Sequence, residues 1–230
     1  MGEFLANASR ILSASERQAE ISGHNIANLT TPGFKRSVAF ESLVSREGQG
    51  ISGRSYTQFT SGSVSNTGNN LDLALQGEAF FVIQGAEGPR YTRNGQFRRA
   101  ADGALVTATG QVVLGADGRG IRLSGEPVEV TADGQILEAG AIAGRLALAE
   151  FDDLGRLQIE RDGAFSATDA GVRPSTKAVV RQGMVEGSNV SAADEMVEIM
   201  AALRRAEAGQ RMVAAYDELI GRVFTSLGQG

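Results

Sequence analysis

The sequence contains no cysteine, one histidine and only four prolines, and each shortage narrows what the chain can do. Without cysteine there is no disulfide, no thiolate zinc site and no cysteine nucleophile, and either redox compartment is tolerated. With His24 as the single histidine, a metal ion would have only carboxylate and carbonyl ligands, so we expect no metal site and no cofactor.

Long hydrophobic runs are also missing, since no window is apolar enough to span a membrane. The N-terminus lacks the basic region and the continuous apolar stretch of a secretory signal, so we expect no cleaved signal peptide. The formal net charge of −5 argues against nucleic acid as a partner, because phosphate binding needs a basic surface.

What the chain does have is length and hydrophobic content. Its 230 residues, 42% of them hydrophobic, suffice for one good core or for one core with helical arms. Thirty glycines beside four prolines indicate many tight turns rather than disorder.

Near the N-terminus, apolar or small residues recur at alternating steps of three and four, which is typical of a helix that packs on another helix. Bulky residues hold one position of this repeat and small residues the other. The stripe is too weak to stabilise a lone helix in water, so the helix needs a partner. The stripe comprises Leu5, Ala8, Leu12, Ser15, Ala19, Ser22, Ile26 and Leu29.

A second helix is predicted at the C-terminal end. Ser191 and Asp194 resemble a capping box at its start, and it should end near Leu227. Gly209 lies inside it and should cost about 1 kcal/mol relative to alanine. We expect the two helices to pair with each other or with the same helices of neighbouring copies. The second stripe comprises Met196, Ile199, Leu203, Ala206, Gln210, Val213, Asp217, Ile220, Phe224 and Leu227.

Between the helices, short apolar stretches alternate with turn residues. The segment 71–85 predicts a strand, a turn and a second strand, and 146–151 predicts another strand. Asp-Gly pairs favour hairpin turns, because we expect the aspartate and the glycine to take the positive φ that both central residues of such a turn need. We therefore expect a mainly β chain with an antiparallel central domain, sandwich-like or barrel-like, and α-helical termini that form coiled coils. The expected hairpin pairs are Asp102-Gly103, Asp117-Gly118, Asp133-Gly134, Asp162-Gly163 and Asn94-Gly95.

Catalytic patterns are weak. The segment 115–120 has the glycines of a phosphate loop but lacks the following Lys-Ser/Thr. Glu150, Asp152 and Asp153 could serve a glycosidase, but acidic residues at strand ends are usually solvated. The basic segment 90–100 indicates two strands with exposed arginines that could pair with another subunit. We expect no enzyme activity, no catalytic residue and no small-molecule substrate.

Four segments of the chain resemble the flagellar axial proteins, which are the rod, hook and hook-associated subunits. The first is "HNIANLTTPGFKR", and the second is "NNLDLALQGEAFFVIQG" with its Gly-x-x-Phe-Phe. The third begins "YTRNGQF", and the fourth begins "VEGSNV". They occur in the family's order and together span nearly the whole chain.

The resemblance implies a structural subunit of the flagellar basal-body rod that polymerises through its terminal helices and transmits torque. Its partners would be copies of itself, neighbouring rod subunits and the flagellar type III export apparatus, and it would lie in the periplasmic rod. In the family, distal rod subunits usually have a longer insertion after the first helix. The short segment Phe40–Gln58 therefore favours a proximal rod subunit over a distal one. A cell-wall-acting enzyme and a soluble binding module remain alternatives of a different class.

We therefore expect the chain to divide into three parts. Residues 1–36 form the N-terminal helix and the corner, and residues 37–182 form the β-rich domain. Residues 183–230 form the C-terminal helix, which pairs with the N-terminal helix in the filament. In the corner, Pro32 presets φ and Gly33 supplies the positive φ of a type II turn. Phe34 should be buried, whereas Lys35 and Arg36 should meet acidic surface of a neighbour. The predicted corner motif is Asn25, Asn28, Thr31, Pro32, Gly33 and Phe34; the predicted assembly interface is Leu5, Leu12, Ala19, Ile26, Met196, Ile199, Leu203, Val213, Ile220 and Phe224.

Overall fold

The computed structural model describes residues 2–40, 54–160, 162–168 and 170–227. The chain divides into two compact units, which we call the helical unit (residues 1–27, 37–58 and 190–230) and the β unit (residues 28–36 and 59–189). Within the described ranges, no helix combines the length and the apolar character that a membrane crossing would require.

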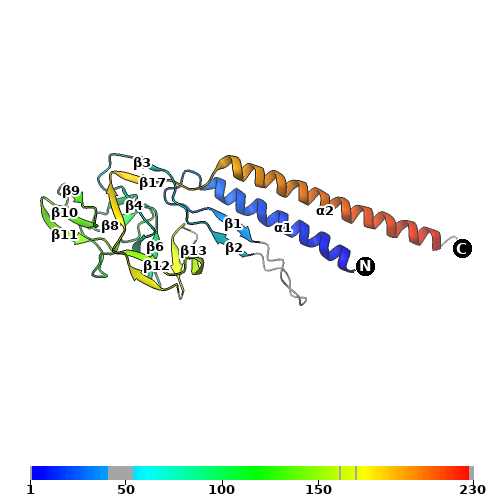
Figure 1. The fold of residues 1–230 in the computed structure, drawn as a ribbon, viewed down its shortest axis with the longest axis horizontal. Coiled ribbons are helices and arrows are strands. Elements are labelled where there is room, and N and C mark those ends of the chain that lie inside the picture. The colour runs from blue at the N-terminus through cyan, green and yellow to red at the C-terminus, as the bar shows by residue number, and fades with distance from the viewer. Residues whose placement is uncertain (1, 41–53, 161, 169, 228–230) are drawn as a thin grey trace. The chain divides into compact units, whose positions relative to one another are not determined.

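The helical unit is built on two antiparallel helices that lie side by side, α1 (Gly2–Ala27) and α2 (Ala192–Leu227) (Figure 1). Helix α2 starts directly after Ser191, whose Oγ accepts a hydrogen bond from the Asp194 backbone N–H at 3.4 Å, which confirms the expected start. Because α2 has 36 residues and α1 has 26, α2 extends past the N-terminal end of α1. A two-stranded sheet of β1 (Ser37–Phe40) and β2 (Arg54–Thr57) completes the unit.

The β unit consists of antiparallel strands in open sheets, so the expectation of a mainly β chain with helical ends is confirmed. The largest sheet has the order β13-β14-β6-β5-β12-β15, and a second has the order β11-β10-β9. The remaining described strands of the unit pair as β16-β4, β17-β3 and β7-β8. The bounds are β3 Val64–Asn66, β4 Leu73–Gln76, β5 Phe80–Gln84, β6 Pro89–Thr92, β7 Phe97–Arg99, β8 Leu105–Thr107, β9 Val128–Val130, β10 Gln135–Glu138, β11 Ala141–Arg145, β12 Leu148–Phe151, the 3-10 helix η1 Leu154–Arg156, β13 Leu157–Ile159, β14 Phe165–Ala167, β15 Val172–Pro174, β16 Val179–Gln182 and β17 Met184–Glu186.

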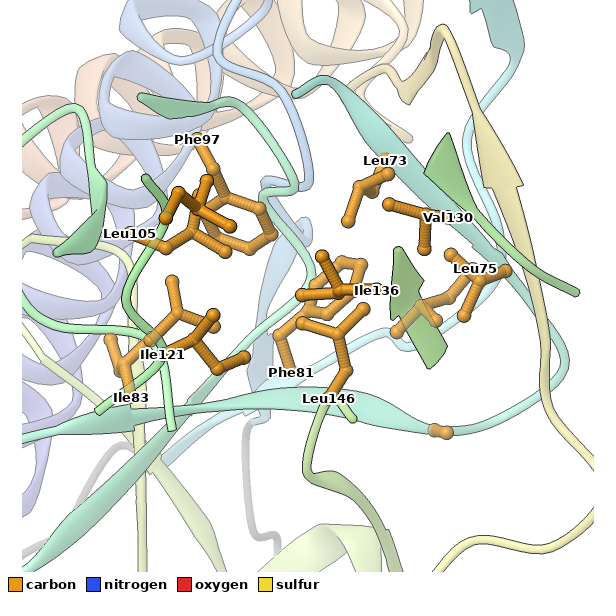
Figure 2. Packing of buried hydrophobic residues seen from close by; sticks show 14 of the residues in the cluster. Leu73, Leu75, Phe81, Ile83, Phe97, Leu105, Ile121, Val130, Ile136 and Leu146 are labelled. Carbon is orange, nitrogen blue, oxygen red and sulfur yellow. The ribbon is translucent and has the colours of Figure 1, made fainter. Parts of the chain in front are cut away.

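The burial of β5 on both faces explains why the run "FFVI" has no polar residue. Phe81 and Ile83 point into one hydrophobic cluster, which Figure 2 shows, and Phe80 points into a second cluster on the opposite face. A strand that is covered on both faces is apolar at successive positions, because neighbouring side chains alternate between faces. The second cluster is largely aromatic, and in it Phe80 contacts Phe151 and Phe165 edge-on at centroid distances of 5.3 and 5.7 Å.

Four of the five predicted turn pairs make tight turns, but with a different geometry from the one expected. The glycines have positive φ, whereas the aspartates do not, since Ala139 is the single described non-glycine residue with positive φ. In the turn at Asp102-Gly103, Gly103 N–H bonds to Ala100 O and Ala100 N–H bonds to Ala104 O. This is a type I turn followed by a left-handed glycine. The same pattern recurs at Gly118, Gly134 and Gly163.

The fifth pair, Asn94-Gly95, is not a hairpin, so that prediction was wrong. Strand β6 before it pairs with β5 and β14, and β7 after it pairs with β8. A β-carbon on Gly95 would lie 1.7 Å from the carbonyl oxygen of Leu73, so a close backbone approach requires this glycine.

A two-residue loop with positive φ at both positions, as expected for the Asp-Gly pairs, is found instead at Ala139 (φ 48°) and Gly140 (φ 84°). It connects β10 to β11 with Glu138 opposite Ala141. This is the signature of a type I′ turn, and the alanine conceals it from sequence inspection because Asn, Asp or Gly is usual there.

Candidate assembly surface and the corner that supports it

The seam between α1 and α2 is made of small side chains. On α1, Ala8, Ser15 and Ser22 are spaced by seven residues and are at most 2% exposed. On α2, Ala202 is 1% exposed and Gly209 is buried. Small residues let two helix backbones approach closely, so the small half of the predicted N-terminal stripe forms the contact line. Towards the end of the pair, Phe4 stacks on Tyr216 with a centroid distance of 5.4 Å.

The predicted stripe on α2 divides into two halves in the structure. Ile199, Ala206, Val213 and Ile220 are half-buried on the side towards α1. The other half of the seam lies one residue earlier than the stripe placed it, at Glu195, Ala202, Gly209 and Tyr216. Gln210 and Asp217, which lay on the predicted stripe, are exposed and so are not buried in the seam.

The shift leaves an apolar face on the outside of α2. Met196, Met200 and Leu203 are 54%, 56% and 55% exposed and are spaced as neighbours on one helix face. Of the predicted interface residues, Met196, Leu203 and Leu5 are therefore exposed. The half-buried ones are Leu12, Ala19, Ile26, Ile199, Val213 and Ile220, and the Phe224 side chain lies outside the described residues.

The end of α1 is fixed to β1 by Asn25, which is fully buried. Its Nδ2 donates to the Ser37 carbonyl oxygen at 2.8 Å, and its Oδ1 accepts from the Ser37 backbone N–H at 2.9 Å. One side chain therefore satisfies both backbone groups at the start of β1, which gives the sequence motif a structural reason.

The turn after α1 has the predicted form. Phe34 N–H bonds to Thr31 O at 3.2 Å across Pro32 and Gly33, and Gly33 has φ +69°. These are the features of a type II turn. A β-carbon on Gly33 would lie 2.3 Å from the Asn94 backbone nitrogen, so packing also requires glycine. Phe34 is 3% exposed, as expected for an anchor, and Asn28, Thr31 and Pro32 are half-buried.

Lys35 does not meet a neighbour's acidic surface, so that prediction was wrong. It is 1% exposed, and its Nζ lies 2.6 Å from Glu186 Oε1 and 2.9 Å from the carbonyl oxygen of Thr60. Glu186 is also 1% exposed. The sequence could not reveal this pairing because 151 positions separate the two residues.

Arg93 likewise departs from the expectation of exposed arginines in the segment 90–100, since it is 4% exposed. Its Nε donates to Glu186 Oε2 at 2.9 Å, and its Nη1 donates to the carbonyl oxygens of Gly77, at 2.9 Å, and Ala79. Its Nη2 donates to Leu75 O at 3.3 Å and lies 2.8 Å from Glu186 Oε2. The guanidinium thus holds the β4–β5 connection.

We call Lys35, Arg93 and Glu186 the buried cluster. Burial alone would raise the pKa of the Glu186 carboxyl, but the Arg93 charge and the Lys35 hydrogen bond outweigh it and hold that pKa below its usual value. Burial lowers the pKa of the Lys35 ammonium against the opposing pull of Glu186. The lowered pKa favours the ionised form of Glu186, which is the one acidic side chain in contact with two basic ones.

The four segments that resemble the axial proteins converge on this cluster. Lys35 comes from the corner segment, Arg93 from "YTRNGQF" and Glu186 from "VEGSNV". The segment with Gly-x-x-Phe-Phe supplies the carbonyl groups of Gly77 and Ala79. In the sequence the four segments look like separate motifs. A charged residue in three of them is the signal that could have indicated a shared ion cluster.

The surface around the buried cluster gives little support for a catalytic or ligand-binding site. A cavity of about 390 Å³ is lined by Lys35, Arg93, Phe59, Phe80 and Leu154 among others. The Arg93 donors that face it are already bonded within the chain. No group of three or more His, Cys, Asp or Glu side chains within the described ranges could hold a metal ion. His24 is exposed on α1.

Comparisons with known proteins match most of the chain. Residues 74–167 match the family described as "Flagellar hook protein FlgE/F/G D1 domain", and residues 181–225 match "Flagellar basal body rod FlgEFG protein C-terminal". The chain is 31% identical to the flagellar basal-body rod protein FlgF of Caulobacter vibrioides over 93% of each chain. It is 34% identical to FlgF of Mesorhizobium japonicum over 84% of this chain and 85% of the relative.

It is also 30% identical to the flagellar basal-body rod protein FlgG of Agrobacterium fabrum, over 97% of this chain and 98% of the relative. FlgF and FlgG relatives therefore match at similar identity. Together with the four converging segments, these matches over nearly the full length mean that the chain belongs to the family of flagellar basal-body rod proteins.

Proposed function

We propose that this chain is a structural subunit of the flagellar basal-body rod, FlgF-like in the first place and FlgG-like as the alternative. The observation that carries the proposal is the exposed apolar face of α2, formed by Met196, Met200 and Leu203 on a helix pair. Heterologous contacts between copies that do not close into a ring produce a helical filament. An exposed apolar helix face supplies the surface for such contacts.

In this proposal the terminal helices form a coiled-coil layer in the assembled rod and transmit torque through it. The β unit packs in a sandwich-like manner on the two faces of β5. Copies of the chain and neighbouring rod subunits are the partners, and the chain reaches the periplasmic rod through the flagellar type III export apparatus without a cleaved signal. The division into residues 1–36, 37–182 and 183–230 stays a prediction.

We also infer that the chain is not an enzyme. The carboxylates considered for catalysis have structural contacts: Glu150 Oε1 accepts from Ser175 Oγ at 2.5 Å, and Asp153 accepts from Gly155 N–H at the start of η1. Arg173 lies 3.4 Å from Asp152. A cell-wall-acting enzyme should keep its activity without the terminal helices, whereas a rod subunit should lose assembly. A soluble binding module would bind its partners as a folded monomer.

The double variant M200D/L203D tests the assembly surface. Because both side chains are more than half exposed, we expect the isolated protein to keep its helix content in circular dichroism. We expect it to fail to restore motility in a strain that lacks the wild-type gene. The matched control is A208D, which places aspartate at an exposed position on another face of α2 and should restore motility. Normal motility with M200D/L203D would contradict the proposed surface.

Hydrogen exchange tests how the helices order. We expect residues 1–30 and 191–227 to exchange more quickly in the isolated protein than in assembled rods, because weak stripes gain most from partner helices. Equal protection of both ends in the isolated protein and in rods would instead favour a self-contained fold.

A further inference from the structure

The chain passes between its helical unit and its β unit at residues 27/28, 36/37, 58/59 and 189/190. Three short segments of the β unit border the last three of these crossings: 33–36, 59–62 and 186–189, which we call the connecting segments. Their hydrogen bonds tie them to one another within the β unit.

Glu186 is the residue on which these ties converge. Its Oε1 accepts from Lys35 Nζ at 2.6 Å and from the Gly62 backbone N–H at 3.0 Å. Its backbone carbonyl accepts from Gly33 N–H at 2.8 Å. Its Oε2 accepts from Arg93, which is bonded to the β4–β5 connection. One residue thus binds all three connecting segments to the body of the β unit.

Asn189 adds a second set of ties between the same segments. Its Oδ1 accepts from the Arg36 backbone N–H at 2.7 Å, and its Nδ2 donates to the carbonyl and hydroxyl oxygens of Thr60 at 3.0 Å each. Its backbone N–H bonds to Phe34 O at 3.4 Å. Segments separated by more than a hundred positions are therefore held in a single arrangement.

Glu186 is the one acidic residue of the buried cluster, so we expect its loss to destabilise the cluster more than the loss of Lys35. Loss of Lys35 would leave Glu186 paired with Arg93, whereas loss of the Glu186 charge would leave two buried basic side chains without a carboxylate partner. Removal of one partner of a buried pair is costly because the charge left behind is uncompensated. Glutamine at position 186 keeps the shape and removes only the charge.

We propose that Glu186 is a positioning residue that holds the three connecting segments in one geometry within the β unit. Its role in carrying load through the rod rests on the proposed function as a rod subunit. The geometric role does not, because every contact that supports it lies within one chain.

The absence of cysteine makes a direct measurement possible, since two spin labels can be attached without removing any native thiol. Labels at S61C in the connecting segment 59–62 and at I142C on β11 occupy exposed positions of the β unit. We expect the distance distribution from pulsed electron paramagnetic resonance to become at least about twofold wider in E186Q than in the labelled parent. K35M should widen it less, because the Glu186–Arg93 pair remains.

The matched control is D162N, which breaks the ion pair of Asp162 with Arg90 in the same unit, 2.5 Å in length, away from the connecting segments. It should leave the width unchanged. An unchanged width in E186Q overturns the proposal. If E186Q does not fold, K35M decides: an unchanged width in that variant also overturns it.

Hydrogen exchange separates a local effect on the connecting segments from general destabilisation of the β unit. In E186Q the amide of Gly62, which donates to the Glu186 carboxylate, should exchange at least about tenfold faster, whereas the amide of Val82 in β5 should keep its rate. Equal acceleration at both amides overturns the proposal. Failure of the wild-type chain to enter rods would overturn the proposed function and leave the widths and exchange rates as a separate result.

Discussion

Gly209 of α2 lies so close to Leu12 of α1 that a β-carbon added to the glycine would stand 3.3 Å from both Cγ and Cδ2 of the leucine. From the sequence alone this glycine is only a cost to helix formation. In the helix pair it is the residue that permits the close approach of α1. The same atom would stand 3.4 Å from Ile11 Cγ2, so little room exists for the leucine to yield.

The variant G209A should therefore destabilise the helical unit by about 1 kcal/mol, because overpacking outweighs the gain of about 1 kcal/mol in helix propensity. The control G23A, on α1, has nothing within 4 Å of the new β-carbon and should stabilise by up to about 1 kcal/mol. Urea unfolding followed by far-ultraviolet circular dichroism measures both. A stability of G209A equal to that of G23A would mean that Leu12 moves freely.

The Asn25–Ser37 contact makes a second prediction. In N25A both backbone groups of Ser37 lose their partner, and we expect a loss of about 2–3 kcal/mol in the free energy of unfolding of the helical unit. N7A makes the same change at an exposed position of α1 and should have an effect within about 0.5 kcal/mol. Similar unfolding midpoints for the two variants would contradict the structural role of Asn25.

The type I′ turn at Ala139-Gly140 predicts a stabilising change. Alanine at φ 48° is strained, and glycine or asparagine adopts this conformation at lower cost. A139G and A139N should raise the thermal unfolding midpoint of the β unit, by an amount that corresponds to about 0.5–1 kcal/mol. A141G, in β11, should lower it, since glycine weakens a strand. A lower midpoint for both substitutions at position 139 would argue against the turn.

The buried cluster predicts how stability depends on pH. Because the pKa of Glu186 is lower in the folded chain, the folded state binds this proton less tightly than the unfolded state does. Its contribution is fully present above the unfolded pKa of about 4.3 and is lost as the pH falls through the folded pKa.

We therefore expect wild type to exceed E186Q in free energy of unfolding at pH 7 and the difference to shrink steadily below about pH 4.3. Urea titrations at a series of pH values measure it. E160Q, an exposed carboxylate of the same unit, serves as the matched control for the loss of one negative charge. A difference between wild type and E186Q that is independent of pH would show that folding does not lower the pKa of Glu186.

The outline of this protein could be predicted from the sequence because local rules govern it. Alternating apolar residues and Asp-Gly pairs indicated the β-rich middle, and Ser191 with Asp194 marked the start of α2. Pro32 and Gly33 indicated a type II turn that the structure contains. Each of these signals lies within a few residues of the feature that it predicts, so no long-range information was needed.

Contacts between distant residues could not be predicted in the same way. The sequence contained Lys35, Arg93 and Glu186, but nothing in their spacing distinguishes a buried ion cluster from three solvated charges. Half of the face of α2 that meets α1 was placed one residue away, because Ala202 and Gly209 are weak hydrophobic signals although their small size decides the packing.

The sequence by itself thus determined the helical ends, the β-rich middle and the corner, which depend on local backbone preference and hydrophobic period, and it carried the family resemblance. Only the tertiary structure decided which charges are buried, which face of α2 stays exposed and why Gly95 and Gly209 are glycines. The physical reason is that burial and close approach are properties of pairs of segments, and pairing is established only when the chain has folded.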